Sequence, residues 1–96
     1  MEFEWDEAKS AANIRTHGVS FEQAKAIFNG PVITRVDDRF DYDELREISF
    51  GEIAAGAVLA VVHTFREEKI RIISARPATR SERVRYYAEI QASFDN

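Results

Sequence analysis

Arginine, histidine and carboxylate side chains stand in or beside three apolar segments of this 96-residue chain, in a pattern that suits phosphate chemistry. The catalytic candidates in or beside these segments are Glu44, Arg46, His63 and Arg76. Metal-free cleavage of RNA needs a base for the 2′-hydroxyl, a cation for the phosphorane and an acid for the 5′-oxygen. Imidazole and guanidinium groups can supply all three functions, so these residues are interpreted as a possible phosphodiester site.

The elements that must position these groups are three predicted strands. Leu45–Phe50 alternates between apolar and polar residues, and Ala57–Phe65 is almost continuously apolar, as in a central strand buried on both faces. Lys69–Ala75 is rich in isoleucine, and a turn centred on Glu67 and Glu68 would join it to the preceding strand as a hairpin. The hairpin fixes a register that can be written out residue by residue.

The predicted register has a direct consequence for the site, because directly paired residues point to the same face of a sheet. The predicted pairs are His63 with Ile72, Val61 with Ser74, Leu59 with Arg76, and Phe50 with Ala57. One face would then carry the polar set Glu44, Arg46, His63, Ser74 and Arg76. The other face would carry Leu45, Val58, Ala60, Val62, Ile73 and Ala75, and would pack the helices. A slip of one residue would reverse these assignments.

Each candidate also has a structural interpretation, and the sequence leaves both open. His63 could be a hydrogen-bonded histidine at the rim of the sheet, and Arg46 with Glu44 could form a surface ion pair of small energetic value. His17 is a further catalytic candidate, but its place beside Gly18 in the last turn of a predicted helix equally suits a C-capping role.

Other basic residues are candidates for RNA binding. Arg80 and Arg83 are three residues apart on the predicted last helix and share a side, where they could follow a phosphate backbone or meet an acidic partner. The full set of RNA-binding candidates is Lys9, Arg71, Arg80 and Arg83. Two histidines and no cysteine make a zinc site improbable, and we expect neither a metal nor a cofactor.

Capping patterns and periodicity define the remaining elements. Asp6 begins a helix over Glu7–Thr16, and the capping box that starts at Ser20 begins a second helix, which Asn29-Gly30-Pro31 ends. Phe3–Trp5 and Val32–Val36 read as strands, and a second capping box, Thr79–Glu82, opens the last helix. The predicted order is β-α-α-β-β-β-β-α, an α+β fold with an antiparallel sheet, two N-terminal helices and one C-terminal helix.

Length and composition indicate the number of domains and the cellular compartment. We expect one domain over residues 1–96, and the absence of cysteine, of a long apolar run and of an N-terminal leader pattern fits the cytoplasm. The net charge of −4 argues weakly against nucleic-acid binding. The charge is uneven, however, because residues 66–85 hold seven basic side chains against three carboxylates, and six of the seven are arginine.

Three blocks of sequence resemble the BrnT toxin family. The first is Phe3-x-Trp5-Asp6-x-x-Lys9-x-x-x-Asn13-x-x-x-His17-Gly18-Val19-x-Phe21-x-x-Ala24. The second is Glu44-x-Arg46 followed by Gly51 and Gly56. The third is Arg71-Ile72-Ile73-Ser74-Ala75-Arg76-x-Ala78-Thr79 with Glu82-Arg83 and Tyr86-Tyr87. The resemblance covers about residues 3–87, which is nearly the whole chain.

The resemblance implies a RelE-like fold and a ribonuclease that blocks translation. It also implies an antitoxin partner, BrnA, that silences the toxin and through which the complex binds operator DNA. Departures from the family pattern are the apolar segment 52–55, His63 in place of a common aromatic residue, and Pro77 in place of a frequent Lys or Arg. The departure at His63 weakens its catalytic assignment.

Two functions of different classes therefore remain. The first is a metal-independent endoribonuclease, neutralised by a BrnA-type antitoxin. The alternative is a non-catalytic, antitoxin-bound subunit that contributes to operator binding and autoregulation.

Overall fold

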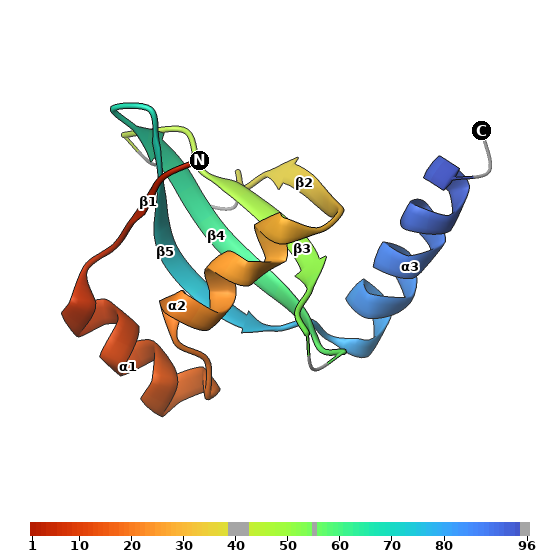
Figure 1. Cartoon of the computed structure of the whole chain (residues 1–96), viewed down its shortest axis with the longest axis horizontal. Coiled ribbons are helices and arrows are strands. Elements are labelled where there is room, and N and C mark those ends of the chain that lie inside the picture. Colours follow the sequence, from red (N-terminus) through yellow and green to blue (C-terminus); the bar gives the residue numbers. More distant parts are fainter. Residues whose placement is uncertain (39–42, 55, 95–96) are drawn as a thin grey trace.

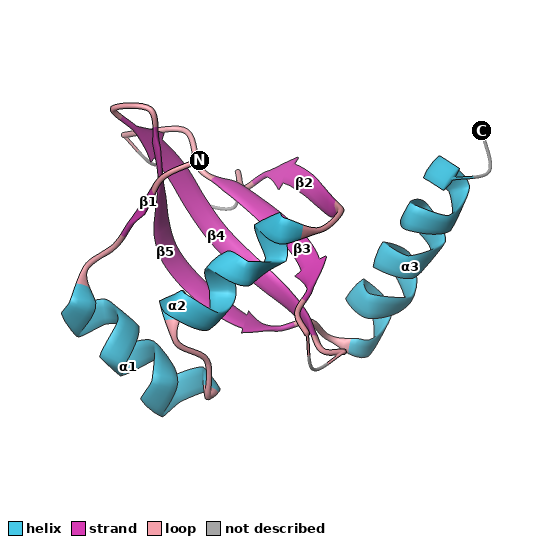
Figure 2. Ribbon diagram, viewed as in Figure 1, coloured by secondary structure: helices cyan, strands magenta, loops and turns pink. Residues whose placement is uncertain are grey.

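The computed structural model describes residues 1–38, 43–54 and 56–94, and this part of the chain forms a five-stranded sheet with three α-helices and one 3-10 helix (Figures 1 and 2). The elements are β1 (Phe3–Glu4), α1 (Glu7–His17), α2 (Phe21–Ala24), η1 (Lys25–Asn29), β2 (Val32–Val36), β3 (Glu47–Glu52), β4 (Val58–Arg66), β5 (Lys69–Pro77) and α3 (Arg80–Phe94). The order of strands across the sheet is β1-β5-β4-β3-β2. The α+β class and the chain order of helices and strands agree with the sequence prediction.

The expectation of a purely antiparallel sheet is wrong at one edge. β1 pairs in parallel with β5, with Phe3 opposite Ile70, whereas the other three pairs of strands are antiparallel. Parallel strands need a long crossover connection, and most of the chain between β1 and β5, including α1 and α2, supplies it. A two-residue strand carries no sequence pattern that could reveal its partner.

Local capping explains where the N-terminal helices begin and end. The Asp6 carboxylate accepts hydrogen bonds from the backbone N–H groups of Ala8 and Lys9, and Gly18 ends α1 in the left-handed conformation at φ 74°. The predicted capping box of Ser20 and Gln23 is present. The second helix is shorter than its apolar stripe suggests, because after Ala24 the chain tightens into η1.

A buried amide joins α1 to the sheet. The Asn13 Nδ2 group donates to the carbonyl oxygens of Val19 and Ala75, at 2.8 and 2.7 Å, and Oδ1 accepts from the Ala75 N–H at 3.3 Å. Asn13 is 7% exposed, so these bonds satisfy polar groups that water does not reach. The side chain thus fixes α1 against β5 and explains why an asparagine stands in the middle of this helix.

The predicted strand register is correct at one pair and wrong elsewhere. His63 lies opposite Ile72 as expected, but an irregularity between Val62 and His63 shifts the rest of the hairpin, so that Val61 faces Ala75 and Leu59 faces Pro77. An extra residue in one strand of a pair has this effect, and no turn residue announces it in the sequence.

The β3–β4 register is also wrong, because Phe50 pairs with Ala60 rather than Ala57. The predicted strand ends at Phe50, but Gly51 lies inside β3 next to η1, where a Cβ atom would come within 2.7 Å of the Ile27 Cβ. The glycine therefore provides room for close packing, and β3 continues to Glu52.

The two faces of the sheet have different neighbours. One cluster packs α2 and η1 against residues such as Leu59, Val61 and Ile72, and this surface is called the helix-side face. A second cluster places Tyr86 of α3 against Phe50, Val58 and Ala60 on the opposite face. Figure 1 shows α3 extending from the end of β5, away from α1 and α2. Among the described residues, no helix has the length and apolar character needed to cross a membrane.

Candidate functional site

Arginines of β2, of β5 and of the segment before β3 lie on the side of the sheet that α3 approaches, which is called the arginine face. Arg35 pairs with Ile48, Arg71 with Thr64, and Arg76 with Ala60. The Asp37 N–H donates to the Arg46 carbonyl oxygen, so the β2–β3 ladder continues and alternation places Arg46 on the side of Ile48. The arginine face consists of Arg35, Arg46, Arg71 and Arg76 around a floor of Ile48, Phe50, Ala60 and Val62.

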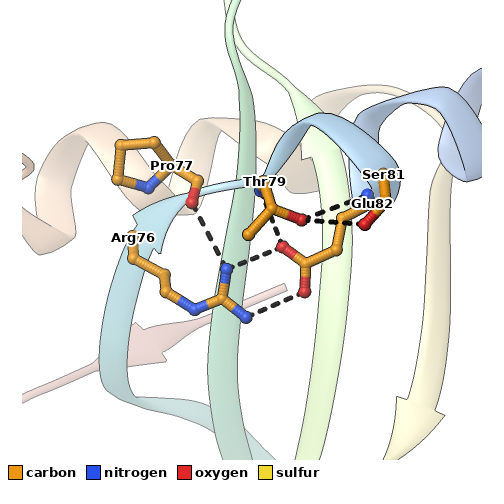
Figure 3. A network of polar contacts seen from close by, with 5 residues as sticks. All are labelled: Arg76, Pro77, Thr79, Ser81 and Glu82. Carbon is orange, nitrogen blue, oxygen red and sulfur yellow. Dashed lines mark hydrogen bonds and ion pairs between the residues drawn. The ribbon is translucent and has the colours of Figure 1, made fainter.

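Arg76 makes a bidentate contact with Glu82 at the start of α3 (Figure 3). Its Nη1 and Nη2 atoms donate to Oε1 and Oε2 of Glu82 at 2.7 and 2.9 Å. The Glu82 Oε1 atom also accepts from the Thr79 N–H at 2.8 Å, which completes the predicted capping box. The Arg76 hydrogen bond is the main reason that the pKa of Glu82 is lowered to about 2. Glu82 is therefore ionised at neutral pH and balances the Arg76 charge.

Arg35 makes the second link between the sheet and α3. Its Nη2 atom donates to both carboxylate oxygens of Glu89, at 2.9 and 2.8 Å, and Arg85 Nε lies 3.6 Å from the same carboxylate. The hydrogen bond from Arg35 is the largest cause of the lowered pKa of Glu89. A cavity of about 220 Å³ lies between α3 and the sheet, lined by Ile33, Arg35, Phe50, Glu82, Arg85, Tyr86 and Glu89.

The other two arginines of this face also contact carboxylates. Arg71 Nη1 donates to Glu4 of the neighbouring strand at 2.7 Å, and Arg46 Nε lies 3.9 Å from Glu44, which also contacts Arg66. The structure thus contains the ion pair of Arg46 with Glu44 that the sequence left open as an alternative. These side chains are about one quarter to one third exposed, so solvent reaches every pair.

The prediction that His63 shares a face with Arg46 and Arg76 is wrong. His63 lies on the helix-side face, is 1% exposed, and packs against the edges of the Phe28 and Phe65 rings. Its Nε2 atom is 2.7 Å from the Ser49 hydroxyl, which is in turn 2.7 Å from the Thr34 hydroxyl. Burial lowers its pKa to about 4, so the ring is neutral and inaccessible to a polymer such as RNA.

The remaining predicted residues are distributed over other surfaces. His17 and Lys9 are exposed on α1, which packs beside β5 and the start of α2 and contributes no residue to the arginine face. Ser74 does lie on the arginine face, opposite Val62. Arg80 and Arg83 are exposed on α3. Of the predicted catalytic set, the structure places Arg46 and Arg76 on a common face, with Glu44 beside Arg46, and leaves both histidines elsewhere.

Arg35 and Glu82 were not predicted as parts of the site. Arg35 is the only charged residue in Val32–Val36. Because it stands two positions after Ile33, strand alternation could have placed both side chains on the same side of the sheet. The sequence identified Glu82 as the last residue of a capping box and as part of the family pattern, but did not predict its contact with Arg76. Among the described residues, no group of three or more histidine or acidic side chains is arranged to hold a metal ion.

Comparison with models of known protein families identifies the family of this chain. Residues 5–82 match the model of the family described as "Ribonuclease toxin, BrnT, of type II toxin-antitoxin system". The match covers most of the chain, which therefore belongs to the BrnT family of ribonuclease toxins from type II toxin–antitoxin systems.

A solved structure supports the fold independently. The chain is similar to the ribonuclease toxin BrnT of Brucella abortus, with a TM-score of 0.61 and 24% sequence identity. The similarity covers 83% of this chain and 99% of the Brucella chain. No match was found among curated proteins.

Proposed function

We propose that this chain is a metal-independent endoribonuclease that stops translation by cutting RNA on its arginine face. The observation that carries the proposal is the placement of Arg35, Arg46, Arg71 and Arg76 on one side of the sheet, reached from three different strand segments. Guanidinium groups bind phosphate through paired hydrogen bonds and stabilise the charge that develops during phosphodiester cleavage. The family's ribonuclease description supports the same reaction.

The carboxylates on this face can be exchanged for phosphate. Each arginine pair is partly exposed, and exposed ion pairs contribute little free energy, about 1 kcal/mol or less. An RNA phosphate that takes the place of Glu82 would receive the same bidentate contact from Arg76. In this proposal Glu82 holds Arg76 in position and competes with the substrate.

The role that we assign to the arginine face is charge stabilisation and not proton transfer. With a pKa near 2, Glu82 is too weak a base to take a proton from a hydroxyl group efficiently. His63 is buried on the other side of the sheet, and His17 stands on α1, so neither histidine is included in the proposed site.

The proposed partner and the place of action are those implied by the toxin–antitoxin family. A BrnA-type antitoxin binds the toxin and silences it, the complex reaches operator DNA through the antitoxin, and the released toxin acts on cytoplasmic RNA. The RelE-like character of the fold belongs to the same proposal. The support for an antitoxin partner is the type II toxin–antitoxin description of the family.

The test is cleavage of bulk RNA by the purified protein in EDTA. Arg46→Ala and Arg76→Ala should each lower the rate about 100-fold, the loss typical of removing one stabilising donor. Arg15→Ala is the matched control, because Arg15 is an exposed arginine on α1 and lies outside the arginine face. Unfolding midpoints should accompany each rate, since Arg76 also contacts α3.

A wild-type rate that equals the rates of both alanine variants would reject the ribonuclease site. A second candidate function, a non-catalytic subunit that contributes to operator binding with its antitoxin, would then take precedence. The observation in its favour is that all four arginines of the face contact carboxylates. It predicts no cleavage, together with tighter operator binding by the toxin–antitoxin complex than by the antitoxin alone.

A further inference from the structure

The long helix α3 has apolar residues on two sides, and the sheet covers only one of them. Tyr86 is 4% exposed, donates a hydrogen bond to the Pro31 carbonyl oxygen, and packs with Ile90 against the sheet. By contrast, Val84 and Phe94 are 61% and 75% exposed, and Tyr87, whose ring packs on Tyr86, is 43% exposed. A helix that needed only to pack on this sheet would be apolar on one side.

The exposed residues follow a regular spacing. Val84, Tyr87, Gln91 and Phe94 are separated by three, four and three positions, the repeat by which one helix packs along another. These four residues are called the outer stripe. Their side of the helix lies away from Glu82, Tyr86 and Glu89, which line the cavity against the sheet. The outer stripe is therefore directed towards solvent, except that the Tyr87 hydroxyl donates a hydrogen bond to Glu52 of β3.

The charged residues of α3 that border the outer stripe are arginines, and Glu52 of β3 contacts the stripe at Tyr87. Glu82 and Glu89, the two carboxylates within α3, contact Arg76 and Arg35 of the sheet. Arg80 lies one turn before Val84 and Arg83 lies one turn before Tyr87, and both are exposed. The outward surface of α3 is consequently a largely apolar stripe with positive charge from Arg80 and Arg83 along its first two turns.

The apolar side chains of the outer stripe and the arginines beside them favour some binding partners over others. RNA would pair with the arginines but would gain little from the aliphatic side chain of Val84 or from an apolar stripe of this length. A second copy of the chain, aligned in parallel, would bring Arg83 towards its own counterpart. An amphipathic helix with acidic borders matches both the stripe and the charge.

We propose that the outer stripe of α3 is the docking surface for an acidic amphipathic helix of the antitoxin. The inference rests on the proposed pairing with an antitoxin and adds the location and chemistry of the contact. The family match ends at residue 82, so the outer stripe lies beyond the matched segment. This location suits a contact that distinguishes the module's own antitoxin from those of related modules.

The experiment measures binding of the purified full chain to the protein encoded by the reading frame next to its gene. Val84→Glu and Phe94→Glu place a carboxylate in the exposed stripe, and each should weaken binding about 30-fold, the effect of losing a central contact. Arg83→Glu should weaken binding and reduce its dependence on salt. Arg15→Glu, a charge change on α1, should leave affinity within about threefold. Thermal unfolding of every variant confirms that the domain is folded.

The outcomes separate this inference from the proposed function. If the wild type binds and Val84→Glu and Phe94→Glu bind equally well, the docking surface is wrong while the antitoxin pairing stands. If the wild type does not bind, the pairing fails and the docking surface fails with it. Loss of RNA cleavage with unchanged binding would make the stripe an RNA surface. A wild-type dimer that Val84→Glu dissociates in sedimentation would make it a self-association surface, and either result overturns the proposal.

Discussion

The two faces of the sheet use polar side chains in opposite ways. On the helix-side face, Asn13 and His63 are at least nine-tenths buried, and their hydrogen bonds connect elements that must stay together. On the arginine face, Arg35 and Arg76 contact carboxylates in pairs that solvent reaches. Buried polar groups are costly to disturb, whereas exposed pairs exchange partners at little cost. The helix-side face therefore carries stability, and the arginine face is available for a ligand.

The largest effect on stability is expected when the buried amide of Asn13 is removed. Asn13→Ala leaves the Val19 carbonyl and both backbone groups of Ala75 without their side-chain partner. We expect a loss of about 4 kcal/mol in the free energy of unfolding, since each buried group left unsatisfied costs about 1–3 kcal/mol. Urea unfolding followed by circular dichroism measures it, and a loss no larger than that of the exposed substitution Arg15→Ala would contradict the structural role.

The second test uses pH. The pKa of His63 is lowered to about 4 by burial, so the folded state binds fewer protons than the unfolded state between pH 6.5 and pH 4. Stability should be full above pH 6.5 and should fall by about 3 kcal/mol as the pH drops to 4, at 1.36 kcal/mol per pKa unit.

His63→Gln is the control for this window, because an amide does not titrate. Its urea midpoint should be nearly constant between pH 6.5 and pH 4. Glu82, with a pKa lowered to about 2, begins to lose its stabilising effect near pH 4.5, but both proteins contain it and the comparison between them removes its contribution. An equal decline in the variant would show that other groups cause it.

A smaller effect is expected at the close approach of η1 to the sheet. Gly51→Ala places a Cβ atom 2.7 Å from the Ile27 Cβ, so one of the two segments must move. Overpacking of this kind costs about 2 kcal/mol in unfolding free energy. Gly30→Ala is the matched control, since nothing lies within 4 Å of its added Cβ. Equal stability of the two variants would contradict the packing explanation.

The smallest predicted effect is a gain. Glu67 and Glu68 join β4 to β5 with φ angles of 53° and 69°, a conformation that side chains rarely adopt. Replacing them by Asn-Gly, the preferred pair for this turn, should stabilise the domain by about 1 kcal/mol. A higher midpoint in thermal unfolding at unchanged RNA cleavage is the expected result, and a lower midpoint would contradict the assignment of strain to this turn.

The residues show why part of this arrangement could be predicted and part could not. Asp6, Ser20 and the Thr79–Glu82 capping box act through neighbours in sequence, so their helix starts were visible. The irregularity beside His63 depends on how two strands meet, and it moved His63 and Arg76 to opposite faces. Arg35 became part of the site through Glu89, 54 residues away, a contact that only the packing of α3 creates.

The central claim is that the arginine face, and not His63, contacts RNA, and the pair of variants Glu82→Gln and His63→Gln tests it directly. Gln keeps the cap contact at Thr79 but removes the charge that competes for Arg76, so Glu82→Gln should cleave RNA several-fold faster than the wild type in EDTA. His63→Gln, measured where it is fully folded, should keep the wild-type rate. A folded His63→Gln variant without activity, beside a Glu82→Gln variant no faster than the wild type, would contradict the account.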